Sequence, residues 1–285
     1  MEASGTARRI SARFVAGETL DDALRVGRKI NSEGITLTLD HLGESVTSLG
    51  EAAAARDVYV ETLAAIHQHA IRGNVSLKLT QFGMDLSQEE CRANVAMLVA
   101  GAARMGSFVR IDMESSAHTD RTLGLVEELH EQYGVVGTVI QAYLYRSRKD
   151  VERLCARGIR IRLCKGAYLE HAAVAFPSKA DVDRNYIELM QLLLDEGEYP
   201  AIATHDESLI EQTKAYAARR GIAPGRFEFQ MLYGIRRDLQ RRLVNEGYGL
   251  RLYVPFGKAW YPYFMRRLAE RPANIFFLAR HLFRQ

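Results

Sequence analysis

The sequence is poor in the features that mark secreted, zinc-binding or membrane-spanning proteins. Its three cysteines, Cys91, Cys155 and Cys164, are odd in number and form no CxxC pair. We therefore expect neither a disulfide framework nor a structural zinc site, and we predict a reducing, cytoplasmic setting. No run of eighteen apolar residues occurs, and residues 1–20 lack a continuous apolar stretch. These absences predict no transmembrane helix and no signal peptide, and they leave peripheral contact with a membrane open.

A strong excess of charge of one sign is also absent. The 38 basic residues nearly balance the 35 acidic ones, and the formal net charge of the 285-residue chain is +3. This balance leaves no broad electrostatic footprint for nucleic acid, so no nucleic-acid partner is predicted. The chain also lacks a GxGxxG fingerprint after a strand-like run and a P-loop lysine, which disfavours a Rossmann or P-loop nucleotide site.

What the sequence does contain is a regular alternation of strand-like runs and amphipathic helical segments. Each run is short, rich in β-branched or aromatic residues, and bounded by turn-forming residues. Strict alternation implies a parallel sheet, and eight such units predict an α/β fold of the closed (β/α)8 TIM-like barrel type, in preference to an open doubly wound sheet. The predicted strands are Ile35–Asp40, Asn74–Thr80, Phe108–Glu114, Val136–Tyr143, Ile159–Gly166, Ala201–Asp206, Arg226–Met231 and Gly249–Phe256.

The chain shows no internal linker that would divide the barrel. No Pro-, Gly- or Ser-rich stretch interrupts it. We therefore predict one catalytic domain over residues 35–285, preceded by a helical extension over residues 1–34. Ser87 followed by Glu90 matches a capping box and predicts that a helix starts there.

Polar side chains end most of the predicted strands. In a parallel barrel these ends meet at one face, where the active sites of such barrels lie. Lys78, Asp112 and Arg162 sit in otherwise apolar runs, where an unpaired charge is costly, so we expect them to face a polar ligand at the barrel mouth. Other polar residues at strand ends are Asp40, Glu114, Gln141, Lys165, Thr204, His205, Gln230 and Tyr253.

The segment RLCKGAY has the chemistry of a pyrophosphate site. It carries cations at Arg162 and Lys165, followed by Gly166. A glycine lets the backbone approach a ligand closely, and the two cations suit an anion. An ordinary turn between a strand and a helix is the alternative interpretation.

The C-terminal segment YPYFMRRLAERPAN has the chemistry of a carboxylate site. Pro262 and Pro272 can open and close a helix in which Arg266 and Arg267 are adjacent and Glu270 follows. Two neighbouring guanidinium groups suit a carboxylate ligand. A solvated Arg–Glu pair on a surface helix is the alternative.

These segments resemble a known family. RLCKGAY, ATHD, FEFQMLYG, YVPFG and RRLAE are similar, in kind and in order, to the signature segments of proline dehydrogenase, and LTLDHLGESVT resembles its short monofunctional bacterial form. The likeness extends from about Gly34 to Asn274. It implies a distorted (β/α)8 barrel with FAD at its C-terminal mouth and a C-terminal helix over the substrate.

The resemblance also implies an activity and its partners. The reaction would be oxidation of L-proline to Δ1-pyrroline-5-carboxylate, the first step of proline catabolism to glutamate, by hydride transfer to flavin N5. A quinone would reoxidise the flavin, which would explain a peripheral membrane contact. Pyrroline-5-carboxylate dehydrogenase would act downstream. The resemblance implies no metal, and the oligomeric state is not predicted.

Individual residues receive roles from the same resemblance. Asp112 and Arg162 would be the catalytic residues, with Arg162 beside flavin N5. Glu228 and Gln230 are further candidates. Substrate-binding residues would be Lys78, Tyr168, Tyr253, Tyr263, Arg266 and Arg267. Cofactor-binding residues would be Met113, Gln141, Arg162, Lys165, Gly166, Ala167, Thr204 and His205.

Three other functions stay open on the sequence. Lys78 and Lys165 at strand ends would suit an aldolase that forms a Schiff base. A metal-dependent hydrolase is disfavoured, because His67 and His69 are two residues apart on a predicted helix and cannot share a metal. The third is a non-catalytic barrel that binds acidic partners through its slight positive excess.

Overall fold

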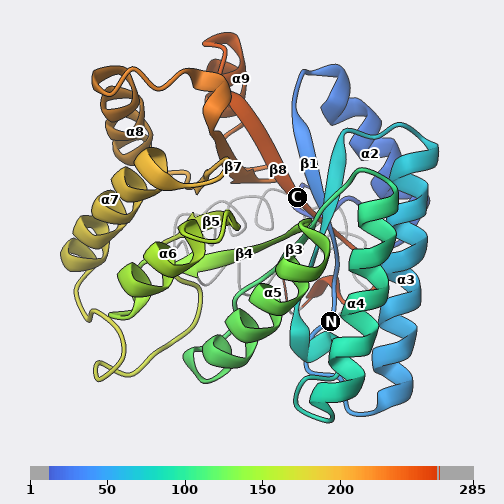
Figure 1. The fold of residues 1–285 in the computed structure, drawn as a ribbon. Coiled ribbons are helices and arrows are strands. Elements are labelled where there is room, and N and C mark those ends of the chain that lie inside the picture. Colours follow the sequence, from blue (N-terminus) through green and yellow to red (C-terminus); the bar gives the residue numbers. More distant parts are fainter. Residues whose placement is uncertain (1–12, 262, 264–285) are drawn as a thin grey trace, which may run out of the picture.

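The computed structural model describes residues 13–261 and 263, and in this part of the chain eight parallel strands close into a barrel in chain order. Strand β8 returns to pair with β1, which aligns Thr36 with Arg251 and His41 with Phe256. The helices form an outer ring around the strands (Figure 1). The predicted (β/α)8 barrel is confirmed. Its strands are β1 (Thr36–His41), β2 (Gly73–Leu77), β3 (Val109–Ile111), β4 (Val136–Gln141), β5 (Arg160–Cys164), β6 (Ala201–Ala203), β7 (Glu228–Leu232) and β8 (Gly249–Phe256).

The first described helix, α2 (Leu20–Ser32), precedes β1 but belongs to the outer ring. It starts with a full capping box, in which Thr19 Oγ1 accepts from the Asp22 N–H at 3.2 Å and Asp22 Oδ2 accepts from the Thr19 N–H at 3.3 Å. Its buried side packs against β1 and β8. The N-terminal segment therefore covers the seam where the barrel closes, a place that a helix after β8 would fill in a regular barrel.

The other helices follow their strands. Helix α4 begins where Ser87 and Glu90 predict, and Ser87 Oγ accepts from the Glu90 N–H at 3.2 Å. The reciprocal bond from the Glu90 side chain does not occur among the described residues. None of the described helices combines the length and the apolar character that crossing a bilayer requires. The remaining elements are α3 (Leu49–Gln68), η1 (Leu79–Phe82), α4 (Gln88–Arg104), η2 (Ser116–His118), α5 (Thr119–Tyr133), α6 (Ser147–Cys155), α7 (Lys179–Glu196), α8 (Glu207–Arg219), η3 (Pro224–Arg226) and α9 (Arg237–Asn245).

Five predicted strands, those matching β2 to β6, are too long by two or three residues at their C-terminal ends. Strand β2 stops at Leu77, and a 3₁₀ helix follows, while β3 stops at Ile111. The Glu114 carboxylate accepts from the Thr80 N–H at 3.0 Å and from Thr80 Oγ1 at 2.6 Å. This side chain therefore joins the loop after β3 to the segment after β2 at the barrel mouth.

Alternation along the strands decides which side chains reach the barrel interior. In β1 the apolar residues Leu37 and Leu39 are fully buried, and Leu37 packs under Gly27 of α2. Successive strand residues point to opposite faces, so Thr38 and Asp40 point inward. Thr38 Oγ1 donates to Asn74 Oδ1 of β2 at 2.6 Å inside the barrel. In β1 the inward-facing Thr38 and Asp40 are therefore polar, whereas Leu37 and Leu39 on the outward face are apolar.

Candidate functional site

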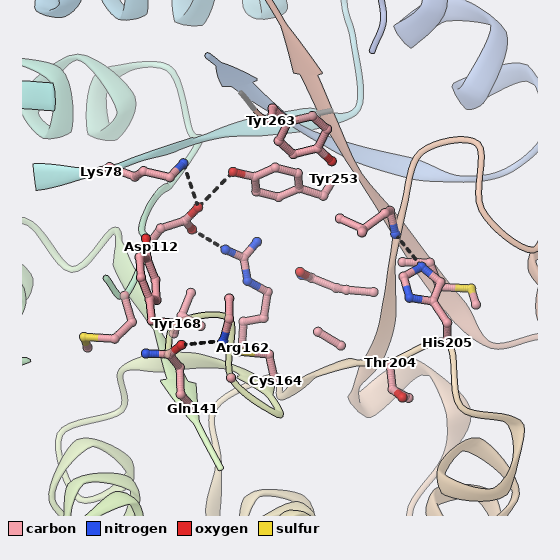
Figure 2. Close-up of a pocket in the computed structure, with 18 residues that line it drawn as sticks. Lys78, Asp112, Gln141, Arg162, Cys164, Tyr168, Thr204, His205, Tyr253 and Tyr263 are labelled. Carbon is pink, nitrogen blue, oxygen red and sulfur yellow. Dashed lines mark hydrogen bonds and ion pairs between the residues drawn. The ribbon is translucent and has the colours of Figure 1, made fainter. Parts of the chain in front are cut away.

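The C-terminal ends of the strands surround a cavity of about 310 Å³ (Figure 2). This volume is at the lower end of the range for small-molecule sites, about 300–1,000 Å³. Arg266 and Arg267 lie outside the described residues. Every other residue predicted for the site except Lys165 and Glu228 lines the cavity: Lys78, Asp112, Met113, Gln141, Arg162, Gly166, Ala167, Tyr168, Thr204, His205, Gln230, Tyr253 and Tyr263.

Asp112 is the centre of a buried charged cluster. Figure 2 shows Lys78, which follows β2, Arg162 of β5 and Tyr253 of β8 pointing at its carboxylate. Oδ1 accepts from Arg162 Nη2 and from Ser76 Oγ, and Oδ2 accepts from the Tyr253 hydroxyl at 2.9 Å. The Arg162 guanidinium also lies over the Tyr253 ring, 5.2 Å from its centroid. Closure of the barrel thus brings Lys78, Asp112 and Arg162, which come from three different strand-like runs, next to one another.

The charges of this cluster stabilise one another. Burial opposes the charge on Asp112, but Arg162 and Lys78 together with the Ser76 and Tyr253 hydrogen bonds hold its pKa below the ordinary value. Burial likewise opposes the charge on Arg162, and Asp112 raises its pKa. Both groups therefore stay ionised at neutral pH, and a ligand in the cavity meets a fixed guanidinium group.

Lys78 occupies a position between two carboxylates. Its Nζ lies 3.6 Å from Asp40 Oδ1 and 4.0 Å from Asp112 Oδ2. Burial opposes the lysine charge, but Asp40 and Asp112 raise its pKa. A lysine that forms a Schiff base needs a neutral amine, so this environment argues against the aldolase alternative at Lys78.

Lys165 is a described candidate that does not line the cavity. Its Nζ pairs with Asp183 Oδ1 at 2.5 Å and with Asp206 Oδ2 at 3.2 Å. Asp206 also caps α8, since its Oδ1 accepts from the Ser208 N–H at 3.1 Å. The lysine therefore ties the end of β5 to helices α7 and α8.

Gln141 joins two loops at the cavity edge. Its Nε2 donates to the Glu114 carbonyl at 2.9 Å, and its Oε1 accepts from the Ala167 N–H at 3.1 Å. Figure 2 shows the second of these bonds. The amide therefore holds the backbone after β3 and after β5 in register at the site.

Gly166 is a glycine for a reason that the sequence did not reveal. Its φ is +142°, and a Cβ added there would lie 2.6 Å from the ring of Tyr143. The Tyr143 ring therefore fills the space beside Gly166. Contact between Tyr143 and residue 166 is thus a structural reason for glycine at this position. Close approach of the backbone to a ligand here is a separate prediction.

Thr204 and His205 continue the cavity wall after β6. His205 Nε2 accepts from the Leu232 N–H at 2.9 Å (Figure 2), so the neutral ring carries its proton on Nδ1. Thr204 Oγ1 accepts from the Asp206 N–H at 3.0 Å. Both side chains thus fix the turn that leads into α8.

Glu228 and Gln230 have different positions. Glu228 Oε1 accepts from Arg251 Nε at 2.7 Å and from Gln230 Nε2 at 2.6 Å. Arg251 Nη1 also donates to Asn74 Oδ1 at 3.0 Å. Glu228 therefore belongs to a polar network in the barrel interior below the cavity, whereas Gln230 lines the cavity itself.

Several residues of the site had no role in the sequence predictions. Ser76 bonds Asp112, and Tyr59 of α3 donates to Asp40 Oδ1 at 3.2 Å. The alternation of strand residues could have found Ser76, two positions before Lys78, whereas Tyr59 sits on a helix and gave no signal. The other lining residues without a predicted role are Val139, Cys164, Ala203, Met231 and Leu232.

The site therefore combines a fixed guanidinium, an ammonium and a carboxylate with apolar and aromatic walls. Over the described ranges, no three histidine, cysteine, aspartate or glutamate side chains gather in a way that could hold a metal ion. His67 and His69 are exposed at the end of α3. Such an arrangement can bind a small zwitterion beside a flat, partly apolar ring system.

Comparisons with known proteins agree with this geometry. The chain matches the family model described as proline dehydrogenase over residues 23–280. It is 42% identical over 267 residues to proline dehydrogenase 2 of Bacillus subtilis, with 94% of this chain and 88% of the relative covered. It is also 42% identical over 276 residues to proline dehydrogenase of Deinococcus radiodurans, with 95% and 89% covered.

A solved structure has the same fold. Proline utilization A (PutA) from Bdellovibrio bacteriovorus, inactivated by N-propargylglycine, superposes with a TM-score of 0.86 at 28% identity. The match covers 92% of this chain and 32% of the PutA chain. This chain therefore corresponds to about a third of that larger protein.

Proposed function

The chain belongs to the proline dehydrogenase family, and from this premise we propose that it oxidises L-proline to Δ1-pyrroline-5-carboxylate with an FAD held at the barrel mouth. The observation that supports the proposal most directly is the cluster of Lys78, Asp112, Arg162 and Tyr253 on one side of the cavity. Flavin dependence is general to the family. FAD as the particular flavin, and each residue role below, are proposals.

The residues of the cavity fit a flavin. Met113, Val139 and Met231 provide apolar walls, and Arg162 provides a cation at the edge. A volume of about 310 Å³ suits a flat ring with a small amino acid beside it. The rest of a dinucleotide would extend over the loops that contain Gly166 and Thr204, at the end of the cavity where α8 begins. The N-terminal end of a helix favours phosphate groups.

When bound, the flavin would supply an acceptor for a hydride, which carries both electrons of the oxidation. The protein supplies binding and orientation. Arg266 and Arg267 would hold the substrate carboxylate with charge-assisted hydrogen bonds. Tyr168, Tyr253 and Tyr263 would enclose the ring of proline and exclude water. Arg162, kept charged by Asp112, would stabilise negative charge at the reacting edge of the cofactor.

Proline must lose a proton from its ammonium group before a hydride can leave the carbon next to the nitrogen. Lys78 places a positive charge on the wall of the cavity, and a nearby cation favours the neutral amine. Asp112 would remain ionised, because its pKa is lowered despite burial. Lys78 and Asp112 would therefore determine the electrostatic potential at the nitrogen of proline.

An anaerobic absorbance titration tests the proposal. The purified protein should be yellow, and adding proline without oxygen should bleach the flavin band. Chromatography of the cofactor released by heat should identify FAD in place of FMN. A colourless protein that takes up no flavin, or a yellow protein that proline does not bleach, would contradict the proposal.

Replacing Gly166 by alanine should weaken FAD binding at least about tenfold and lower stability by about 1–3 kcal/mol. The new methyl group would meet the Tyr143 ring at 2.6 Å, in a backbone conformation that favours glycine. Fluorescence titration of the apoprotein measures the affinity.

Gly158 offers a matched control for that substitution. It also has a positive φ, +67°, but nothing lies within 4 Å of an added Cβ. Gly158→Ala should therefore leave FAD affinity unchanged. The second substitution Tyr143→Ala should partly restore FAD binding to Gly166→Ala, and equal FAD affinity in Gly166→Ala and the wild type would refute the role of this contact.

We further propose that a membrane quinone reoxidises the flavin and that a pyrroline-5-carboxylate dehydrogenase uses the product. The product is a cyclic imine that hydrolyses to an aldehyde, which a dehydrogenase can oxidise to glutamate. Stopped-flow mixing of the reduced enzyme with a soluble quinone analogue should restore the flavin band faster than mixing with NAD. Faster recovery of the flavin band with NAD than with the quinone analogue would contradict the proposal of a quinone acceptor.

A further inference from the structure

A carboxylate behind the cavity has no role in the function proposed above. Asp40 is the last inward-facing residue of β1, and it is 1% exposed. Its Oδ1 accepts from the Tyr59 hydroxyl at 3.2 Å, and its Oδ2 is buried and has no hydrogen-bond partner among the described residues. A buried carboxylate with an unused oxygen is costly unless a donor or a proton reaches it.

Lys78 connects this carboxylate to the cavity. Its Nζ is 3.6 Å from Asp40 Oδ1, and its side chain lines the cavity with 13% exposure. Hydrogen bonds between nitrogen and oxygen span about 2.7–3.2 Å, so neither Asp40 nor Asp112 holds an ammonium hydrogen firmly. A shift of about half an ångström would bring one N–H into bonding distance of Asp40.

The two carboxylates beside Lys78 have opposite environments. Asp112 receives Ser76, Arg162 and Tyr253, and its pKa is lowered although it is buried. Burial raises the pKa of Asp40, although Lys78 opposes this shift. Where the pKa values of two neighbouring groups are driven apart, one stays ionised and the other takes the proton.

Charged and titratable groups face this pair from every neighbouring element. Tyr59 of α3, Asp112 after β3 and Tyr253 of β8 act on Asp40. Asp40 in turn acts on Arg162 of β5 and on His41, the next residue of β1. Glu44 and Glu114 act on Lys78 at longer range. Asp40 is the carboxylate of this group that lies next to Lys78 and keeps an oxygen without a bonded donor.

We propose that Asp40 is the proton acceptor behind Lys78 in proline oxidation, a positioning residue that acts through the lysine ammonium group. This inference rests on the proposed function. An Nζ–H bond breaks as an O–H bond forms on Asp40, and the nitrogen lone pair then takes a proton from the substrate ammonium. The electron pair of the broken substrate N–H bond stays on the proline nitrogen. No electron is transferred in this step, Lys78 ends as an ammonium, and Asp40 ends neutral.

The substitution Asp40→Asn tests the proposal by a pH profile. The measurement is anaerobic flavin reduction by proline, expressed as the second-order rate constant. The wild type should be nearly independent of pH between about 6.5 and 9, because it accepts the zwitterion. Asp40→Asn should be slower by about 10²–10³-fold near neutral pH, and its rate should rise about tenfold per pH unit, since it depends on proline that is already deprotonated.

The control is Asp57→Asn, which removes a carboxylate that is 68% exposed on α3. It should keep the wild-type profile. A profile of Asp40→Asn that runs parallel to the wild type would reduce Asp40 to a structural role and overturn the proposal. A rise in its rate at neutral pH would do the same, because it would identify neutral Lys78 as the base.

Tyr59→Phe tests the proposal even if Asp40→Asn does not fold. The Tyr59 hydroxyl lowers the pKa of Asp40 against the larger effect of burial, so its loss should raise that pKa further. A protonated Asp40 cannot accept a proton, so activity falls as pH drops through its pKa. The acid limb of the profile should therefore move to higher pH in Tyr59→Phe, and an unmoved limb would overturn the assignment. If proline fails to bleach the wild type, the proposed function fails. If proline bleaches the wild type and the profiles of the variants match the wild-type profile, only Asp40 is misassigned.

Discussion

Replacing Arg162 by methionine should lower the rate of anaerobic flavin reduction by about 10²–10³-fold, the usual cost of one catalytic donor. Arg162 is 8% exposed, lines the cavity and donates to Asp112. Its guanidinium would face the negative charge that develops during the reaction. The dissociation constant of proline should change less than about tenfold, because Arg266 and Arg267 would hold the carboxylate. Rapid mixing at several proline concentrations separates the two quantities.

The same substitution should shift acid unfolding. Although burial opposes its charge, Asp112 has a lowered pKa that depends on Arg162, so its carboxylate stabilises the fold above its unfolded pKa. That stabilisation is lost as pH falls through the folded pKa. Without Arg162 the folded pKa rises, so acid unfolding should begin at higher pH, and stability at neutral pH should fall by about 3–5 kcal/mol.

Arg160→Met is the matched control for this prediction. Arg160 lies in the same strand, with its guanidinium over the rings of Phe108 and Tyr199 at 5.3 and 5.7 Å from their centroids. It should cost about 0.5–1 kcal/mol of stability and leave flavin reduction unchanged. An unchanged single-turnover rate in Arg162→Met, with FAD bound, would reject the role proposed for Arg162.

Replacing Arg266 or Arg267 by methionine should raise the KM for proline by about 10- to 100-fold. A hydrogen bond to a charged group contributes about 1.5–3 kcal/mol, and each arginine would supply at least one to the substrate carboxylate. FAD should remain bound with an unchanged spectrum, since the proposal gives these residues no contact with the cofactor. Steady-state kinetics and cofactor content check the two parts.

Arg241→Met serves as the control for the paired arginines. Arg241 is an exposed residue of α9, so its loss should leave the KM near the wild-type value. If Arg266→Met and Arg267→Met both keep a normal KM, the C-terminal segment does not hold the substrate carboxylate.

The fold could be predicted because its signals are local. The strands are short runs rich in β-branched and aromatic residues between turn-forming residues, and the helices are amphipathic, so both signals can be read within about a dozen positions. The predicted range Gly249–Phe256 agrees with β8 at both ends. The ends of β2 and β3 were predicted too far along the chain, because the bond from Glu114 to Thr80 crosses between two loops. Such a bond leaves no trace in the periodicity of either segment.

The site, like the fold, could be predicted from the sequence only in part. The unpaired charges at Lys78, Asp112 and Arg162 were visible in the sequence, and their position at strand ends placed them at one face. The motif RLCKGAY did not show that Lys165 pairs with Asp183 and Asp206 instead of reaching the cavity. Its partners come from α7 and from the start of α8, and no spacing within the motif encodes that distance.

By itself, the sequence determined the alternation of strands and helices, the number of strands, the family and the set of charges at the strand ends. Only the tertiary structure decided that α2 covers the seam between β1 and β8, that Tyr143 fills the space beside Gly166, and that Asp40 lies behind Lys78. The physical reason is that a periodicity depends on neighbours along one segment. Distances between side chains of different strands depend on how the whole barrel closes, because its tilt and stagger set which residues share a layer.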